Sequence, residues 1–234
     1  MQVLVLSCGR TGTNMLLEIL RGSSYLKATD FAEDKTLFRD GRVLEEGYLS
    51  KCDTVYISNS GQIDRIFEQN PCLRILFTVR DWRDCAMSKF YRGQPGKDNV
   101  VLADDATVDG CLKDIEWMNN IYDYIKDNYP HNILTVKMEE IILDFDNRIK
   151  EVCNFCALYF EKEQMISFTD RYRNNFKSGR YTELDKSQVK LYERLDTVYN
   201  GFFKDDKNKK DIKEVFNRVK PYLEKFGYES DYQI

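Results

Sequence analysis

The sequence predicts an α/β fold, with a mainly parallel five-stranded sheet flanked by helices. Short apolar runs of strand length alternate along the chain with longer segments whose apolar residues recur at helical spacing. Alternation of this kind is typical of βαβ units, whose parallel strands end at one edge of the sheet, where such folds bind ligands. We expect one domain over residues 1–234, with a helical C-terminal part.

The first strand and the first helix have clear hydrophobic patterns. Residues 3–6 are four consecutive apolar residues, as expected of a strand that is buried on both faces of a parallel sheet. Further along, Met15, Leu16, Ile19 and Leu20 recur at the spacing that gathers side chains on one face of a helix. We therefore expect a strand at Gln2–Ser7 and a helix at Thr13–Arg21.

The middle of the chain continues this alternation. The segment Asp34–Leu49 fits neither pattern, because Gly41 and Gly47 interrupt it. The other expected elements are a second strand at Tyr25–Phe31, a third strand at Asp53–Ser58 with its helix at Ile63–Gln69, and a fourth strand at Leu73–Val79 with a helix from Asp84 to Tyr91.

The second half begins with an expected loop at Gly93–Ala106, which carries glycine, proline and paired aspartates. A long helix is expected at Val108–Asn128, because Pro130 stops it. A fifth strand follows at Ile133–Met138, and most of the remaining chain is predicted to be helical.

The loop between the first strand and the first helix has the composition of an anion-binding site. Backbone N–H groups and the helix dipole favour negative charge at such a place. The pattern G-x-x-x-x-G-K-[S/T] of ATP-binding loops is only partly met, since Thr13 and Asn14 replace its lysine and its Mg²⁺-binding hydroxyl. Arg10 adds a permanent cation. The loop suits an anion that needs no metal bridge, although a tight turn without a ligand has a similar composition.

A second polar group follows the fourth strand. Arg80 comes directly after the strand, so we expect it at the ligand-binding edge of the sheet. Asp81 or Asp84 can cap the helix that follows. Arg80 and Ser88 could close on one phosphate, with the guanidinium as a fork and the hydroxyl as a donor. A solvated capping cluster is the alternative interpretation.

Together the two segments resemble the sulfotransferase family. The family's phosphosulfate loop typically reads [R/K]-[S/T]-G-T-[T/S], which residues 10–14 match except at the last position. Its second signature, R-D-P-R-D-x-x-x-S, matches residues 80–88 with Trp82 in place of proline. A third, weaker match is the basic, glycine-containing segment at residues 177–181. The order and spacing of these segments fit the family across roughly residues 1–200.

The resemblance implies a P-loop-like fold, the sulfuryl donor 3′-phosphoadenosine 5′-phosphosulfate (PAPS), and no metal. Asn14 departs from the usual hydroxyl, but its amide can still donate to an oxyanion. Tyr181 is the aromatic residue expected to stack on adenine. By position, the 5′-phosphosulfate would be bound by Arg10, Thr11, Gly12, Thr13 and Asn14, the 3′-phosphate by Arg80 and Ser88, and the nucleotide would be covered by Lys177, Gly179 and Arg180.

The catalytic base is the least determined part of the site. Many family members use a histidine just after the third strand, and residues 55–61 contain none. His131, the only histidine, precedes the fifth strand and should lie at the opposite edge of the sheet. Other branches use a glutamate, so Glu33 after the second strand is the leading candidate base and Asp30 the second; such an acid can also be a cap or a surface charge. Arg10 completes the set of candidate catalytic residues.

The composition of the chain bears on nucleic-acid binding, on membrane insertion and on the redox state of the cysteines. The net charge of −4 argues against non-specific nucleic-acid binding, which needs a broad basic face. No apolar run reaches the ~18 residues of a membrane helix, and we expect residues 1–7 to form a strand of the fold rather than a leader. Among seven cysteines, Cys153 and Cys156 lie in an apolar helical stretch and are expected to be reduced core residues. Free thiols point to a reducing, cytoplasmic location.

Three functions remain open at this point. The first is a sulfotransferase that acts on a hydroxyl of a small molecule or a carbohydrate, because the polar loop Gly93–Ala106 suggests a polar acceptor. The second is a kinase with a degenerate loop, which would need ATP and Mg²⁺. The third is a nucleotide-binding module without catalysis, which the missing histidine allows. The oligomeric state is open.

Overall fold

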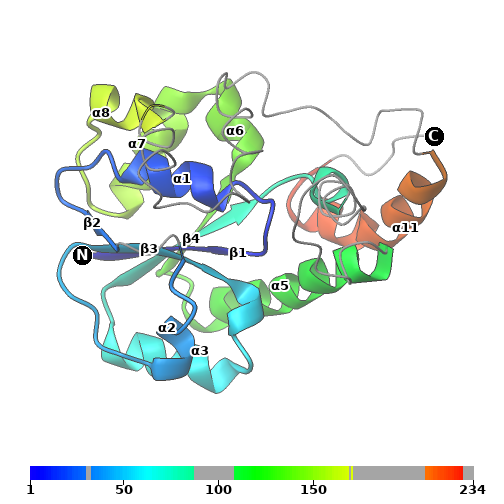
Figure 1. The fold of residues 1–234 in the computed structure, drawn as a ribbon, viewed down its shortest axis with the longest axis horizontal. Helices are drawn as coiled ribbons and strands as arrows, with labels where there is room; N and C mark the ends of the chain where they lie inside the picture. Colours follow the sequence, from blue (N-terminus) through cyan, green and yellow to red (C-terminus); the bar gives the residue numbers. More distant parts are fainter. Residues whose placement is uncertain (30–32, 87–107, 169, 171–208, 229–234) are drawn as a thin grey trace.

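The computed structural model describes residues 1–29, 33–86, 108–168, 170 and 209–228. Its centre is a five-stranded sheet of order β2-β3-β1-β4-β5, in which every adjacent pair of strands is parallel (Figure 1). This confirms the predicted α/β fold. The strands are β1 (Gln2–Ser7), β2 (Lys27–Ala28), β3 (Tyr48–Asp53), β4 (Leu73–Val79) and β5 (Ile133–Lys137).

Helices cover both faces of the sheet. One layer contains α1, α6, α7 and α8, and the opposite layer contains α2, α3 and α5, with α11 packed against α5 (Figure 1). The helical elements are α1 (Thr13–Leu20), α2 (Leu37–Asp40), the 3₁₀ turn η1 (Thr54–Tyr56), α3 (Ser60–Gln69), α5 (Val108–Asn128), α6 (Met138–Leu143), α7 (Phe145–Phe155), α8 (Lys162–Ile166) and α11 (Lys209–Lys225).

Two apolar cores follow from the alternation of side chains along the strands. In β1, Val3 and Val5 face the layer that contains α1, whereas Leu4 and Leu6 face the layer that contains α5. All four side chains are fully buried. A strand covered on both faces needs a continuous apolar run, which explains why β1 was identified correctly from the sequence.

The order of the strands positions the site. β1 lies between β3 and β4, so the chain moves to one side of β1 to form β2 and β3 and then crosses to the other side for β4 and β5. Ligands of open α/β sheets bind where the strand order reverses, outside the carboxyl ends of the strands. The loops after β1, β3 and β4 meet at this place.

The prediction for the third strand was wrong. The strand lies at Tyr48–Asp53 rather than at Asp53–Ser58. Asp53 ends the strand, and its carboxylate accepts a hydrogen bond of 3.1 Å from the Val55 N–H, which starts the 3₁₀ turn. Val55 is 46% exposed, so the alternating residues after Asp53 do not form a half-buried strand. The true strand was missed because Ser50, Lys51 and Asp53 interrupt its apolar pattern.

The prediction for the second strand was too long. β2 contains only Lys27 and Ala28 of the expected Tyr25–Phe31, and Tyr25 is exposed. The Thr29 N–H continues the ladder with a 3.0 Å hydrogen bond to the Leu49 carbonyl. The remaining residues of the predicted strand, 30 and 31, lie outside the described part of the chain.

Most other expected elements are confirmed. β4 and α5 have the predicted bounds, and β5 ends one residue early. Residues 82–86 are helical, as expected for the helix after β4, and the rest of that helix lies outside the described residues, as does the loop Gly93–Ala106. No helix in the described ranges is long and apolar enough to cross a membrane.

The C-x-x-C motif belongs to the core, as predicted. Cys153 and Cys156 are buried and free, and the Cys153 thiol lies 3.9 Å from the Met165 sulfur. Burial raises the pKa of Cys153 to about 11 and that of Cys156 to about 12. Thiols with such pKa values are poor nucleophiles and poor metal ligands at neutral pH.

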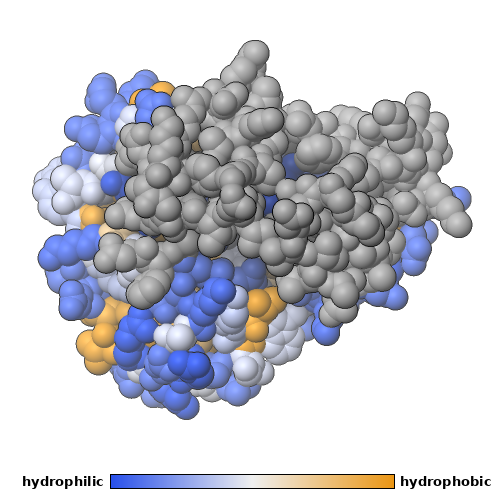
Figure 2. Space-filling view, viewed as in Figure 1, coloured by the Kyte–Doolittle hydropathy of each residue, from blue (hydrophilic) through white to orange (hydrophobic). Residues whose placement is uncertain are grey.

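The surface that the structure describes is mostly hydrophilic. Figure 2 shows small, separate apolar patches between polar residues on one face of the molecule. Scattered exposed apolar residues are ordinary on a folded protein and indicate no partner by themselves. Within the described ranges, the large exposed apolar residues are Tyr25, Val43, Val55, Leu143, Tyr159 and Ile166.

Candidate active site at the carboxyl edge of the sheet

The loop after β1 is held in one conformation by its own backbone and by β4. The fully buried Thr11 hydroxyl donates to the Cys8 carbonyl at 2.9 Å. The Thr78 hydroxyl on β4 lies 2.9 Å from the Thr11 oxygen. Since the single Thr11 proton goes to Cys8, Thr78 is the donor in this second bond. The loop is therefore tied to the neighbouring strand, 67 residues away in the chain.

Two residues of this loop have left-handed backbone conformations. Gly12 has φ +89° and Arg10 has φ +76°, a conformation that costs energy for any residue with a side chain. A Cβ at Gly12 would also lie 2.8 Å from the Met138 sulfur. Glycine therefore avoids both the backbone strain and the close contact at position 12, where the chain turns into α1.

The start of α1 is suited to bind an anion. Gly12 is the N-cap and has no side chain to accept a hydrogen bond from the first turn, and that turn contains no acidic residue. The first N–H groups of a helix need partners outside the helix and carry the positive end of its dipole. An oxyanion in front of Thr13 and Asn14 would supply those partners.

Arg80 connects the second motif to the first. Its side chain is 93% buried, and its Nη1 atom donates to the Arg10 carbonyl at 3.5 Å. Its Nη2 atom lies 3.6 Å from an Asp84 carboxylate oxygen. A further contact joins the Cys85 thiol to the Gly9 carbonyl at 3.4 Å. The two motifs identified in the sequence are thus in direct contact, although 70 residues separate Arg10 from Arg80.

The residues after Arg80 form a buried ion pair. Both nitrogens on one side of the Arg83 guanidinium bind the Asp81 carboxylate, at 2.8 Å from Nε and 2.5 Å from Nη2. Asp81 also accepts the Arg83 N–H at 3.0 Å, so it caps the helical turn at residues 82–86, as expected. Trp82, which replaces the family's proline, is fully buried and meets the Phe226 ring edge-on.

Glu33 lies beside the end of β3. Its carboxylate is 3.9 Å from the Lys51 ammonium group, and the two side chains are 20% and 14% exposed. Burial and the charge of Glu33 raise the pKa of Tyr56 in the neighbouring 3₁₀ turn. Lys35 lies over the Tyr56 ring, 5.8 Å from its centroid. Glu33 therefore belongs to a polar group at the carboxyl edge of β3.

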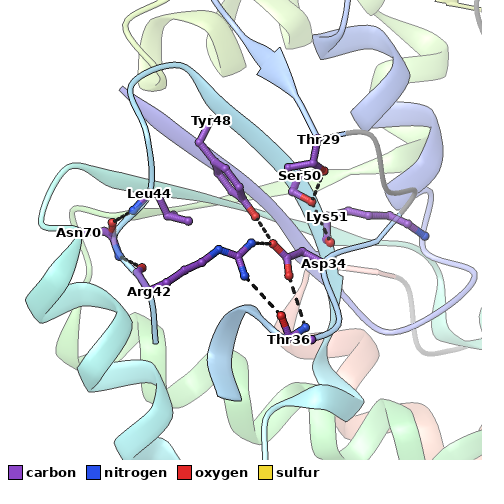
Figure 3. Close-up of polar contacts among 9 residues, drawn as sticks. All are labelled: Thr29, Asp34, Thr36, Arg42, Leu44, Tyr48, Ser50, Lys51 and Asn70. Carbon is purple, nitrogen blue, oxygen red and sulfur yellow. Dashed lines mark hydrogen bonds and ion pairs between the residues drawn. The ribbon is translucent and has the colours of Figure 1, made fainter. Parts of the chain in front are cut away.

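A network around Asp34 fixes the backbone next to Glu33 (Figure 3). The Asp34 carboxylate accepts hydrogen bonds from the Tyr48 hydroxyl at 2.8 Å, from the Thr36 N–H at 3.3 Å and from the Arg42 guanidinium. Burial and the Asp34 charge raise the pKa of Tyr48, so its hydroxyl stays a donor. The Asp34 N–H donates to the Lys51 carbonyl at 2.8 Å and fastens the segment along β3.

Two buried hydroxyls at the same edge make no hydrogen bond within the described part of the chain. They belong to Ser7, the last residue of β1, and to Thr54, the first residue after β3. Ser7 is in register with Asp53, the residue before Thr54. Ser7 and Thr54 therefore lie at the ends of adjacent strands. A buried hydroxyl without a partner costs free energy. The Ser7 hydroxyl, at the start of the loop, therefore fits a bound anion.

The structure places the predicted site residues as follows. The loop from Arg10 to Asn14 and Arg80 are brought together, and Glu33 lies at the end of β3. His131 is exposed and precedes β5, at the opposite edge, as predicted. Outside the described residues lie Asp30, Ser88, Lys177, Gly179, Arg180 and Tyr181.

Sequence reasoning missed two polar residues at this edge. Lys51 was overlooked because β3 was placed too late, and the signal for it is a lysine within an otherwise buried strand. Glu139, in the first turn of α6, accepts a hydrogen bond from the Asp81 N–H at 2.8 Å. No local pattern marks Glu139, because its partner lies 58 residues earlier.

Comparison with known proteins agrees with this geometry. The model of the sulfotransferase domain family matches residues 1–218. A search of curated protein sequences gives no match. Solved structures give several matches at low sequence identity.

One such match is mouse sulfotransferase SULT7A1 complexed with PAP, at 15% identity and a TM-score of 0.58, covering 97% of this chain and 88% of that one. Another is the sulfotransferase domain from the curacin biosynthetic pathway, at 13% identity and a TM-score of 0.62, covering 97% and 98%. A third is retinol dehydratase in complex with androsterone and inactive cofactor PAP, at 12% identity and a TM-score of 0.52, covering 100% and 82%. These likenesses show the fold, and the family match shows that the chain belongs to the sulfotransferase family of enzymes.

Proposed function

We propose that the protein transfers a sulfuryl group from PAPS to a hydroxyl group of a small acceptor. The observation that carries the proposal is the contact between the anion-binding loop and Arg80, with the Arg80 guanidinium 3.5 Å from the Arg10 carbonyl. This contact brings two arginines, Arg10 and Arg80, together with the N-terminus of α1 at one edge of the sheet. A donor with a 5′-phosphosulfate and a separate 3′-phosphate needs two such anion-binding places.

The described residues fit this donor. The turn at Gly12, the first N–H groups of α1 and the Ser7 hydroxyl would bind the 5′-phosphosulfate, together with the Arg10 guanidinium. Arg80 would bind the 3′-phosphate, with Ser88 as the proposed hydroxyl donor. Lys177, Gly179 and Arg180 would cover the nucleotide, and Tyr181 would stack on adenine. PAPS supplies the sulfuryl group, and PAP is the product that leaves.

Each side chain has a defined task in the transfer. The acceptor oxygen forms a bond to sulfur while the bond from sulfur to the 5′-phosphate oxygen breaks. Arg10 and the N–H groups of the loop stabilise the negative charge on the sulfuryl and leaving oxygens. A base removes the acceptor proton, and Glu33 is the proposed base, with Asp30 as the second candidate. Lys51, 3.9 Å from Glu33, orients its carboxylate.

The chemistry of the loop favours a reaction without a metal. Thr13 and Asn14 provide neither the lysine nor the hydroxyl that an ATP- and Mg²⁺-binding loop uses. A kinase function is therefore disfavoured. We propose a polar acceptor such as a sugar, from the polar composition of residues 93–106, and a reducing, cytoplasmic location, from the buried free thiols.

Replacing Arg80 with alanine should weaken binding of PAP (adenosine 3′,5′-bisphosphate) and leave binding of adenosine 5′-phosphate nearly unchanged. A charge-assisted hydrogen bond contributes roughly 1.5–3 kcal/mol, which corresponds to about a 10–150-fold change in the dissociation constant. Titration calorimetry with both nucleotides measures this difference.

Arg74→Ala is the matched control, because Arg74 lies near the amino end of β4, the strand that Arg80 follows, and its guanidinium lies over the Phe155 ring. It should leave both affinities unchanged. Equal weakening of both nucleotides by Arg80→Ala would mean that Arg80 does not recognise the 3′-phosphate.

A further inference from the structure

We propose that Glu139 is a positioning residue for Arg80, and that it connects the donor site to the C-terminal end of α11. This inference rests on the proposed function, because it assumes that Arg80 recognises the 3′-phosphate of the donor. Glu139 lies in the first turn of α6, directly after β5. No sequence motif includes Glu139, and its position in the chain does not mark it as part of the site.

Glu139 holds the peptide group that follows Arg80. Its Oε1 atom accepts the Asp81 N–H at 2.8 Å. That N–H belongs to the peptide bond between Arg80 and Asp81, so its direction restrains the ψ angle of Arg80 and with it the side-chain rotamers that the Arg80 backbone allows. The family's proline at position 82 is absent here, and this hydrogen bond restrains the turn beside it.

The second carboxylate oxygen of Glu139 is bound by the C-terminal segment. The Tyr228 hydroxyl donates to Oε2 at 2.8 Å, and the Tyr228 ring lies under the Lys137 ammonium group, with 5.0 Å between nitrogen and centroid. Burial raises the pKa of Tyr228, and the charge of Glu139 adds to this effect, so the hydroxyl remains protonated. Both Glu139 oxygens thus accept hydrogen bonds, one from the turn after Arg80 and one from the segment after α11.

Apolar packing joins the same two segments. Phe226, next to the end of α11, meets the Trp82 ring edge-on at 5.8 Å and the Tyr122 ring at 5.0 Å. Trp82 follows Asp81 directly, so the turn that carries Arg80 contacts the end of α11 through Trp82 and through Glu139. The family model ends at residue 218, before Phe226 and Tyr228. On the side of α11, the connection is therefore built by two residues that lie beyond the family match, Phe226 and Tyr228.

Electrostatics gives Glu139 a second influence on Arg80. Burial raises the pKa of Glu139, whereas the hydrogen bonds from Asp81 and Tyr228 and the positive charge of Arg80 act in the opposite direction. The Glu139 carboxylate and the Arg80 guanidinium therefore also attract each other. Both effects favour one orientation of Arg80 before the donor arrives, and such preorganisation increases affinity.

The test measures the ratio of the dissociation constants for adenosine 5′-phosphate and PAP. Glu139→Ala should lower this ratio roughly tenfold, because a charged acceptor of the Asp81 N–H is lost. Glu139→Gln should restore the ratio to within about threefold of wild type, since its amide can accept from Asp81 and donate to the Tyr228 oxygen. Glu140→Ala is the matched control: Glu140 is the next residue, is 36% exposed and pairs with Arg148, and its loss should leave the ratio unchanged.

A second readout needs no ligand. Hydrogen exchange at the Asp81 amide should be faster in Glu139→Ala than in wild type or in Glu140→Ala, because the amide loses its acceptor. Tyr228→Phe removes only a hydroxyl and should lower the nucleotide ratio about threefold. It carries the test if Glu139→Ala does not fold, and an unchanged ratio in Tyr228→Phe would then overturn the inference.

The outcomes separate this inference from the function on which it rests. If wild-type protein binds PAP no better than adenosine 5′-phosphate, the proposed recognition of the 3′-phosphate is wrong, and the role of Glu139 falls with it. If wild type prefers PAP, Arg80→Ala loses the preference and Glu139→Ala keeps it, only the positioning role is overturned. Loss of the preference in both variants, with recovery in Glu139→Gln, supports the proposal.

Discussion

Replacing Glu33 with glutamine should slow sulfuryl transfer by about 10²–10⁴-fold, the usual contribution of a general base. Glutamine keeps the size of the side chain but cannot take the acceptor proton. PAP affinity should change little, because Glu33 lies at the end of β3 and pairs with Lys51 rather than with the loop after β1. Turnover is measured with a radiolabelled sulfuryl donor and any hydroxyl acceptor that the wild-type protein modifies.

Two variants distinguish the candidates for the base. His131→Ala should be fully active, because His131 is exposed at the opposite edge of the sheet. If Asp30→Asn loses turnover while Glu33→Gln keeps it, Asp30 takes over the role. Full activity in all three variants would mean that the base lies elsewhere in the chain or that the acceptor needs none.

Replacing Arg83 with alanine should destabilise the fold by about 3–5 kcal/mol, because it leaves the Asp81 carboxylate buried without its guanidinium partner. The two side chains of this ion pair are only 6% and 5% exposed. In addition, the turn that carries Arg80 depends on Asp81 as its cap. Urea unfolding of the variant and the wild type measures the difference in the free energy of unfolding.

The chain contains a matched control for this variant. Arg39 pairs with Asp40 at 2.9 Å, but both side chains are well exposed. Exposed pairs contribute little to stability, so Arg39→Ala should leave the unfolding midpoint close to that of wild type. Equal, small effects of Arg83→Ala and Arg39→Ala would show that the Asp81–Arg83 pair does not stabilise the turn.

Local hydrophobic patterns predict the fold where local rules decide it. The four apolar residues of β1, the apolar run of β4 and the stop at Pro130 after α5 each depend on a few neighbouring residues. The prediction of β3 failed because the strand is buried by partners that are distant in the sequence. Ser50 bonds the Thr29 hydroxyl and the Lys51 carbonyl accepts the Asp34 N–H, so polar residues sit inside a strand that local patterning rejects.

The candidate site, like the fold, could be predicted from the sequence only in part. The order of the strands explains why two motifs 70 residues apart could be expected to meet, because both follow central parallel strands. The roles of Lys51 and Glu139 could not be predicted from the sequence. The place of Lys51 at the site follows only from the true end of β3. The role of Glu139 depends on its contacts with Asp81 and Tyr228, which are 58 and 89 residues away in the chain.

The most direct test of the central claim, a donor site that binds a bisphosphorylated nucleotide without a metal, is thermal unfolding with PAP in the presence of EDTA. At about 100 times its dissociation constant, PAP should stabilise the fold by about 2.7 kcal/mol, which corresponds to roughly 5–10 °C in Tm for a chain of this size. Our expectation is this shift with EDTA and no shift with ATP and Mg²⁺. A shift with ATP and Mg²⁺ alone would contradict it.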